Sequence, residues 1–123
     1  MKRVESRESI LISIKKVLGI YEEDTSFDID IIMHINTVLM ILRQMGIGPS
    51  EGFSVYDSYD TWDDYLSDSS LIESVKTYVA LKVRLIFDPP ASSAIIEAMN
   101  RTISELEWRL NVQADYAKSF EEE

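Results

Sequence analysis

The chain has 123 residues, a formal net charge of -10 and no cysteine. This length suits one domain with a single core, the lack of cysteine excludes disulfides and zinc–thiolate sites, and the acidic balance argues against ordinary nucleic-acid binding, which relies on Lys and Arg. With no apolar run near the roughly 20 residues that span a bilayer and no apolar signal-peptide region, we expect a cytoplasmic protein that makes no membrane contact.

The acidic residues are unevenly distributed. Between Lys16 and Lys76 the only basic residue is Arg43, whereas twelve acidic residues lie in this interval. One interpretation is a solvated acidic surface. The other is a surface that repels an anionic molecule, such as DNA passing close by.

The first predicted helix covers residues 6–18. Its apolar residues recur at helical spacing, and Lys15 and Lys16 occupy the last turn before Gly19. This pattern predicts an amphipathic helix with one buried face.

The second predicted helix, residues 28–45, has two apolar stripes. The first consists of Ile31, Ile35, Val38, Leu42 and Met45. The second lies on the far side of the helix, with Asn36 between its members Ile29, Met33 and Met40. Either another helix of the same chain or a neighbouring subunit must cover the second stripe, and the pattern favours the same chain.

Residues 46–68 form the least regular segment. Residues 53–57 alternate as a short strand does, and a single helical turn capped by Asp60 or Thr61 is expected next. Trp62 either pins this loop to the core or anchors a partner. The loop also carries a candidate acidic surface or channel lining, made up of Asp57, Asp60, Asp63, Asp64 and Asp68.

A central helix is predicted to follow, opened by a capping box of Ser70 and Glu73 and ending at Phe87. Its apolar arc covers more than half of its circumference. Lys82 falls inside this arc, where an unpaired ammonium is costly. We expect it to extend outward to water, the alternative being an ion pair.

Asp88, Pro89 and Pro90 break the helical pattern and predict a rigid elbow. The last helix then begins at residue 92 or 93 and reaches at least Val112, before a frayed acidic tail at 114–123. One face of this helix predicts an antiparallel hairpin with the central helix, through Ile96, Met99, Ile103, Leu106, Leu110, Gln113 and Ala117.

The opposite face of this last helix carries Arg101, Trp108 and Val112. An exposed tryptophan suggests contact with a partner, although packing against the first helix is an alternative. The elbow would then set the angle at which Trp108 is presented.

No constellation of residues indicates catalysis. Asp30 and His34 share a helix face and could contribute to a carboxylate metal site, but His34 is the only histidine, so a surface pair is the preferred interpretation. Phosphate-binding loops, EF-hand spacing and nucleophile motifs are all missing. We expect a non-enzymatic protein without cofactor or metal. The predicted fold is all-α, one domain over residues 1–123 with about four helices and possibly one short strand in the 46–68 loop.

Three stretches together resemble the head–tail connector proteins of long-tailed phages and prophages of Gram-positive bacteria. They are DIIMHINTVLMILRQMGIGP, GFSVYDSYDTWDDYL and SVKTYVALKVRLIFDPPASSAIIEAMNRTISELEWRLN, within residues 28–112. The resemblance implies a helical structural subunit of the virion neck, made in the host cytoplasm and assembled in a ring of about twelve copies.

The expected partners, again from the resemblance, are further copies of the chain, the portal protein, the next neck or tail protein, and genomic DNA that passes without sequence-specific binding. The candidate interface residues are Ile29, Met33, Met40, Trp62, Arg101, Trp108 and Val112. An alternative from charge alone is an acidic DNA mimic that binds a basic partner with strong salt dependence.

Overall fold

In the computed structural model, residues 8–67 and 70–121 are described, with side chains as far as residue 116. The described residues form five helices and no strand, which confirms the all-α prediction. In chain order the helices are α1 (Ile10–Leu18), α2 (Asp28–Gln44), α3 (Trp62–Tyr65), α4 (Ile72–Phe87) and α5 (Ser93–Glu121). None of them is both long and apolar enough to cross a membrane.

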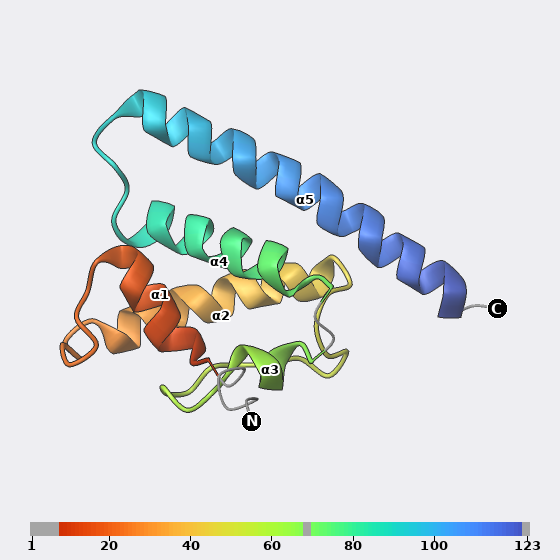
Figure 1. Ribbon diagram of the computed structural model, residues 1–123, viewed down its shortest axis with the longest axis horizontal. Coiled ribbons are helices and arrows are strands. Elements are labelled where there is room, and N and C mark those ends of the chain that lie inside the picture. The colour runs from red at the N-terminus through yellow and green to blue at the C-terminus, as the bar shows by residue number, and fades with distance from the viewer. Residues whose placement is uncertain (1–7, 68–69, 122–123) are drawn as a thin grey trace.

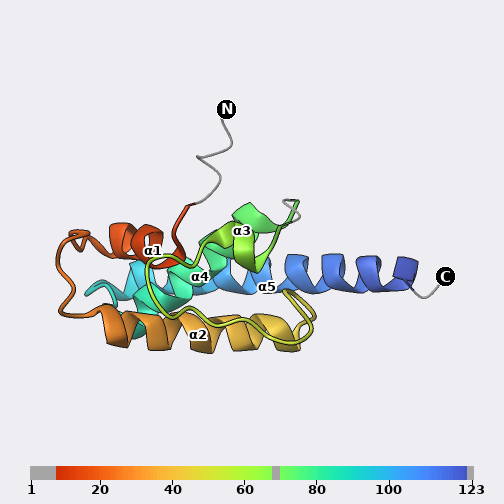
Figure 2. The same ribbon diagram turned by 90° about the horizontal axis from the view of Figure 1, so that it is seen from below.

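Helix α4 forms the middle of the fold. It packs against α2 on one side and α5 on the other, while α1 covers the ends of α2 and α4 (Figures 1 and 2). Val75, Tyr78, Val79 and Val83 of α4 are all buried. One continuous hydrophobic core therefore surrounds α4, as expected of a central helix.

The predicted hairpin of α4 and α5 is present. The two helices run antiparallel (Figure 1), and Ile103 and Leu110 of the predicted seam are buried. Inside this contact the buried Tyr78 hydroxyl donates to Glu107 Oε2 at 2.8 Å. Burial and this hydrogen bond raise the pKa of Tyr78 well above its usual value, so its hydroxyl keeps its proton and donates to the carboxylate.

Helix α1 begins at Ile10, later than predicted, because Ser9 caps it by accepting from the Ile12 N–H at 3.2 Å. Residues 6 and 7 of the predicted helix lie outside the described residues. Gly19, in the left-handed conformation, ends the helix as predicted.

Lys15 does not extend into solvent from the last turn. Its side chain is buried, and Nζ contacts Asp28 Oδ1 at 2.9 Å and the carbonyls of Glu22 at 3.0 Å and Asp24 at 2.7 Å. The two carbonyls accept hydrogen bonds from the ammonium, and Asp28 forms an ion pair with it. Lys15 therefore fixes the 19–27 loop and the start of α2 against α1.

Two details predicted for α4 are wrong or altered. The helix starts at Ile72, so its N-cap is Leu71 rather than Ser70, and Glu73 stands one position too early to complete a capping box. No side chain forms a capping hydrogen bond at this end of the helix. The Glu73 carboxylate instead lies 3.7 Å from Lys76 Nζ. Lys82 is half-buried and its Nζ lies 5.8 Å from the centre of the Tyr78 ring, without an ion pair to any described residue.

The strand predicted for residues 53–57 is wrong. Asn36 of α2 accepts from the Val55 N–H at 2.7 Å and donates to the Val55 carbonyl at 3.0 Å, so a side chain takes the place of a partner strand. The predicted helical turn does form as α3, with Thr61 rather than Asp60 as its cap and with Asp64 completing a capping box. Ser9 and Thr61 form only an isolated bridge.

The elbow after α4 is confirmed as a corner. Asp88 leaves the helical conformation, with φ -152° and ψ 71°, and the Arg84 side chain donates to the Asp88 carbonyl at 2.7 Å. Helix α5 then runs to Glu121, so the expected fraying at 114–123 is wrong for the backbone as far as that residue. With no Gly or Pro in its 29 residues, nothing in the sequence interrupts α5. Residues 122–123 lie outside the described residues.

Candidate interaction surfaces

The second stripe of α2 lies uncovered on the surface. Ile29 is 79% exposed, Met33 56% and Met40 52%, while the first stripe is buried except for the half-buried Met45. The expectation that another helix of the chain covers the second stripe is wrong. The reason is geometric, because α1 and α4 both pack against the opposite side of α2. We call Ile29, Met33 and Met40 the α2 stripe.

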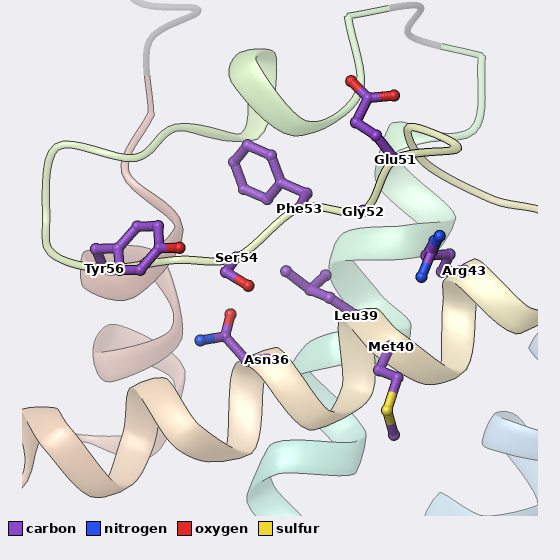
Figure 3. Close-up of a pocket in the computed structure, with 9 residues that line it drawn as sticks. All are labelled: Asn36, Leu39, Met40, Arg43, Glu51, Gly52, Phe53, Ser54 and Tyr56. Atoms are coloured by element: carbon purple, nitrogen blue, oxygen red, sulfur yellow. The ribbon is translucent and has the colours of Figure 1, made fainter.

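A groove lies beside the α2 stripe, between α2 and the 51–56 segment (Figure 3). It has a volume of about 520 Å³, and it is lined by Asn36, Leu39, Met40, Arg43, Glu51, Gly52, Phe53, Ser54 and Tyr56. Asn36 fixes one end of the segment through Val55. At the other end Arg43 Nε and Nη2 donate to the Ser50 carbonyl at 3.0 and 2.7 Å. Side chains of α2 therefore tie both ends of this segment to the helix.

Two residues of this groove were not assigned a role from the sequence. Asn36 lies between the members of the predicted second stripe, and Arg43 is the only Lys or Arg between Lys16 and Lys76. A polar residue inside an apolar stripe was the available signal for Asn36, since such a residue needs a partner. Nothing in the local sequence identifies its partner 19 residues away.

The outer face of α5 is the second exposed apolar surface. Trp108 is 67% exposed and Val112 46%, and Arg101 is also exposed. The alternative that α1 covers Trp108 is wrong, because α1 lies on the other side of α4 (Figure 1). We call Trp108 and Val112 the α5 face.

Trp62 does not belong to an exposed surface. Its side chain is buried, and Nε1 donates to the Ser13 hydroxyl of α1 at 2.9 Å. Of the two roles considered for Trp62, the structure shows the one in which it pins the loop to the core. The indole is unavailable to a partner of the folded chain.

Most acidic side chains of the loop accept hydrogen bonds from backbone N–H groups of nearby loop residues. Asp60 accepts from the N–H of Tyr56 at 2.7 Å, Asp57 accepts from that of Tyr59 at 2.9 Å, and Asp64 caps α3. Asp63 is exposed, and Asp68 lies outside the described residues. These carboxylates therefore shape the loop. The sequence pattern predicts only that they share an acidic surface.

Asp30 and His34 do not form a metal site with other described residues. No cluster of three or more potential ligands occurs in the described part of the chain. The His34 ring instead packs edge-on near Phe87, with 6.3 Å between ring centres. This contact fits the preferred interpretation of His34 as an ordinary surface residue near an acid.

A family model described as phage connector protein matches residues 10–117, which include all five helices except the end of α5. Searches of curated proteins and of solved structures found no significant match.

Proposed function

Since this chain belongs to the phage connector protein family, we propose that it is a subunit of a ring in the virion neck. The ring docks under the portal, lengthens the DNA exit channel and provides the attachment surface for the next neck or tail protein. The observation that carries this proposal is the family match, because it spans nearly the whole folded region rather than one motif. The family is one of structural proteins, and the proposed role needs no cofactor.

Two physical features support a subunit of an assembly. The α2 stripe and the α5 face leave large apolar side chains in water, which is costly for a protein that acts alone. On the α5 face an exposed ion pair between Glu105 and Arg109 flanks Trp108, as polar groups surround the apolar core of protein interfaces. We propose Ile29, Met33, Met40, Arg101, Trp108 and Val112 as interface residues.

The acidic balance also fits the proposal. DNA that slides through a channel should not be held by its phosphates, and a net charge of -10 provides few cations to hold it. The alternative role as a DNA mimic has less support, because such a protein needs an ordered array of free carboxylates, whereas Asp57, Asp60 and Asp64 bond to the backbone.

Binding to the portal tests this function. Purified chain is mixed with DNA-filled heads that carry the portal of the same phage, and the heads are separated by sedimentation. We expect the chain to sediment with these heads and to appear as added density at the portal vertex in negative-stain images. Heads assembled without a portal are the control and should bind none.

Two outcomes would contradict the proposal. One is a chain that binds neither the portal nor any neck protein. The other is a chain that binds a basic nucleic-acid enzyme with strong salt dependence, as a DNA mimic would.

A further inference from the structure

The α2 stripe and the α5 face lie on opposite sides of the molecule. Helix α4 separates α2 from α5 (Figures 1 and 2), and both surfaces point away from it, since the buried residues of α2 and of α5 face inward. One surface therefore cannot cover the other within a chain. Two copies can bring them together, and the contact is then head-to-tail, between different surfaces of the two copies.

The groove beside the α2 stripe suits an aromatic side chain. Its volume of about 520 Å³ lies in the range of pockets that hold small organic molecules, so an indole ring fits. The lining is mixed: Met40 and Tyr56 offer exposed apolar surface, Asn36 and Ser54 are polar, and Arg43 lies beside Gly52 (Figure 3). Arginine stacks favourably on an indole face.

The charges around the two surfaces allow one opposite-charge pair to form between copies, Arg43 with Asp115. The rim of the groove carries one charge of each sign, Arg43 and Glu51. On α5, exposed Arg101 and Asp115 lie two turns before and two turns after Trp108, about 10 Å away in each direction. An Asp115 carboxylate beside Arg43 would meet a guanidinium that already donates to the Ser50 carbonyl through Nε and Nη2 and still has another N–H group to donate.

We propose that Trp108 of one copy inserts into the groove between α2 and residues 51–56 of the next copy, with Val112 against Met40 and Asp115 facing Arg43. Each copy then donates one indole and receives one. A head-to-tail contact of this kind closes into a ring when the rotation between copies allows it. The inference rests on the proposed function, and it assigns the contact between neighbouring subunits of the ring.

Cysteine crosslinking tests this contact without background, because the natural chain has no cysteine. Met40→Cys and Val112→Cys are made as separate full-length variants and bound together to portal-bearing heads. A short thiol crosslinker should give covalent dimers in the mixture and none with either variant alone. A chain with both substitutions should give a ladder of higher oligomers.

The control pair is Tyr21→Cys with Val112→Cys. Tyr21 is 81% exposed and lies in the loop between α1 and α2, outside the groove, so this mixture should give no dimer. Dimers from Val112→Cys alone would overturn the proposal, because they indicate that like surfaces meet. Crosslinks only to a different neck protein would also overturn it.

The crosslinking separates this inference from the proposed function. Heads that bind the chain but yield no dimer between the Met40→Cys and Val112→Cys variants overturn the contact and leave the connector role standing. Heads that bind none of the chain, including the unsubstituted one, overturn both.

Substitution of the indole gives a second measurement. Trp108→Ala should raise the concentration needed for ring assembly on heads about 30-fold or more, as for a central interface residue, while the melting temperature of the free chain stays the same. Tyr21→Ala, which removes an aromatic ring even more exposed than Trp108, should change neither. Unchanged assembly by Trp108→Ala would overturn the proposal.

Charge exchange tests the orientation. Asp115→Arg should weaken assembly, and combining it with Arg43→Asp should restore at least part of the loss. Melting of each variant checks the fold, since Arg43 also bonds Ser50. If the folded double variant assembles no better than Asp115→Arg alone, Asp115 does not face Arg43, and the proposed orientation is wrong.

Discussion

Helices α4 and α5 pack against each other, yet they are buried to very different extents. Helix α4 has neighbours on two sides, and Val75, Tyr78, Val79 and Val83 have essentially no exposed surface. Helix α5 is covered on one side only, and Trp108 on its outer face is 67% exposed. Apart from Ile86 near its end, the apolar residues of α4 are thus largely covered within the fold, whereas those on the outside of α5 are not.

This difference separates two kinds of apolar residue that look alike in a sequence. Those of α4 are needed for the chain to fold, and substitutions there should unfold it. Those of the α5 face and the α2 stripe are available to other molecules, and substitutions there should leave the free chain folded. Matched substitutions at buried and exposed positions can test this division.

The largest expected loss comes from a charge in the middle of α4. Val79→Asp places a carboxylate in the core without a partner, which should lower the free energy of unfolding by about 4 kcal/mol or more. The matched change Met33→Asp, on the α2 stripe, should alter the free energy of unfolding by no more than about 0.5 kcal/mol. Denaturant unfolding followed by circular dichroism measures both. Equal losses would contradict the division.

The next largest effect is expected at Lys15. Lys15→Ala leaves the Asp28 carboxylate and two carbonyls without their shared donor, and should cost about 3 kcal/mol. The neighbouring Lys16 is exposed, so Lys16→Ala should change the free energy of unfolding by no more than about 0.5 kcal/mol. Thermal melting of both variants gives the comparison, and a Lys15→Ala chain as stable as Lys16→Ala would show that the buried ammonium contributes nothing.

An intermediate effect is expected where α4 meets α5. Tyr78→Phe removes the hydrogen bond to Glu107 and should cost about 2 kcal/mol, because the acceptor is a carboxylate. Tyr65 is the control: its buried hydroxyl has no hydrogen-bond partner among the described residues, so Tyr65→Phe should cost nothing or stabilise slightly. Hydrogen exchange in α5 should increase only in Tyr78→Phe.

The same tyrosine makes stability depend on alkaline pH. The unfolded chain loses the phenol proton near the ordinary pKa of 10.0, whereas burial keeps the pKa of Tyr78 higher in the folded chain. The folded state therefore binds more protons above this pH, and stability falls as pH rises. Tyr78→Phe should show a shallower fall between pH 9.5 and 11 than the unsubstituted chain. A fall of equal slope would contradict this assignment.

The smallest effect on the free chain is expected at the elbow. Replacing Pro89 and Pro90 together by alanine should lower the free energy of unfolding by only about 1 kcal/mol, mainly by loosening the unfolded chain. The angle between α4 and α5 should become less defined, so rings on heads should be fewer or irregular in electron micrographs. Tyr21→Ala, outside the elbow and the groove, should assemble normally. Intact rings from the double variant would show that the elbow does not guide assembly.

Much of the fold could be predicted because apolar spacing and helix breakers are local. The bounds of α2, the end of α1 at Gly19 and the corner at Asp88 all followed from such signals. The prediction of a strand at 53–57 was wrong. Its residues do alternate, but the Asn36 side chain, and not a neighbouring strand, bonds the backbone of Val55. A bond to a residue 19 positions away depends on tertiary structure, which local patterns do not contain.

The candidate surfaces were predicted in part. The spacing of Ile29, Met33 and Met40 identified a second apolar stripe, yet it could not determine that no helix of the chain covers it. In the sequence both Trp62 and Trp108 allow either packing within the chain or contact with a partner, but Trp62 is buried and donates to Ser13, whereas Trp108 faces water. Spacing defines which residues share a face, whereas coverage depends on where the other helices pack.

A reconstruction of the neck of intact particles by electron cryomicroscopy tests the central claim most directly. We predict a closed ring of five-helix subunits below the portal, in which the α5 face of each copy meets the α2 stripe and groove of the next, while α4 contacts no neighbour. A neck without this chain, or a ring whose α5 face and α2 stripe both point into solvent, would contradict the account.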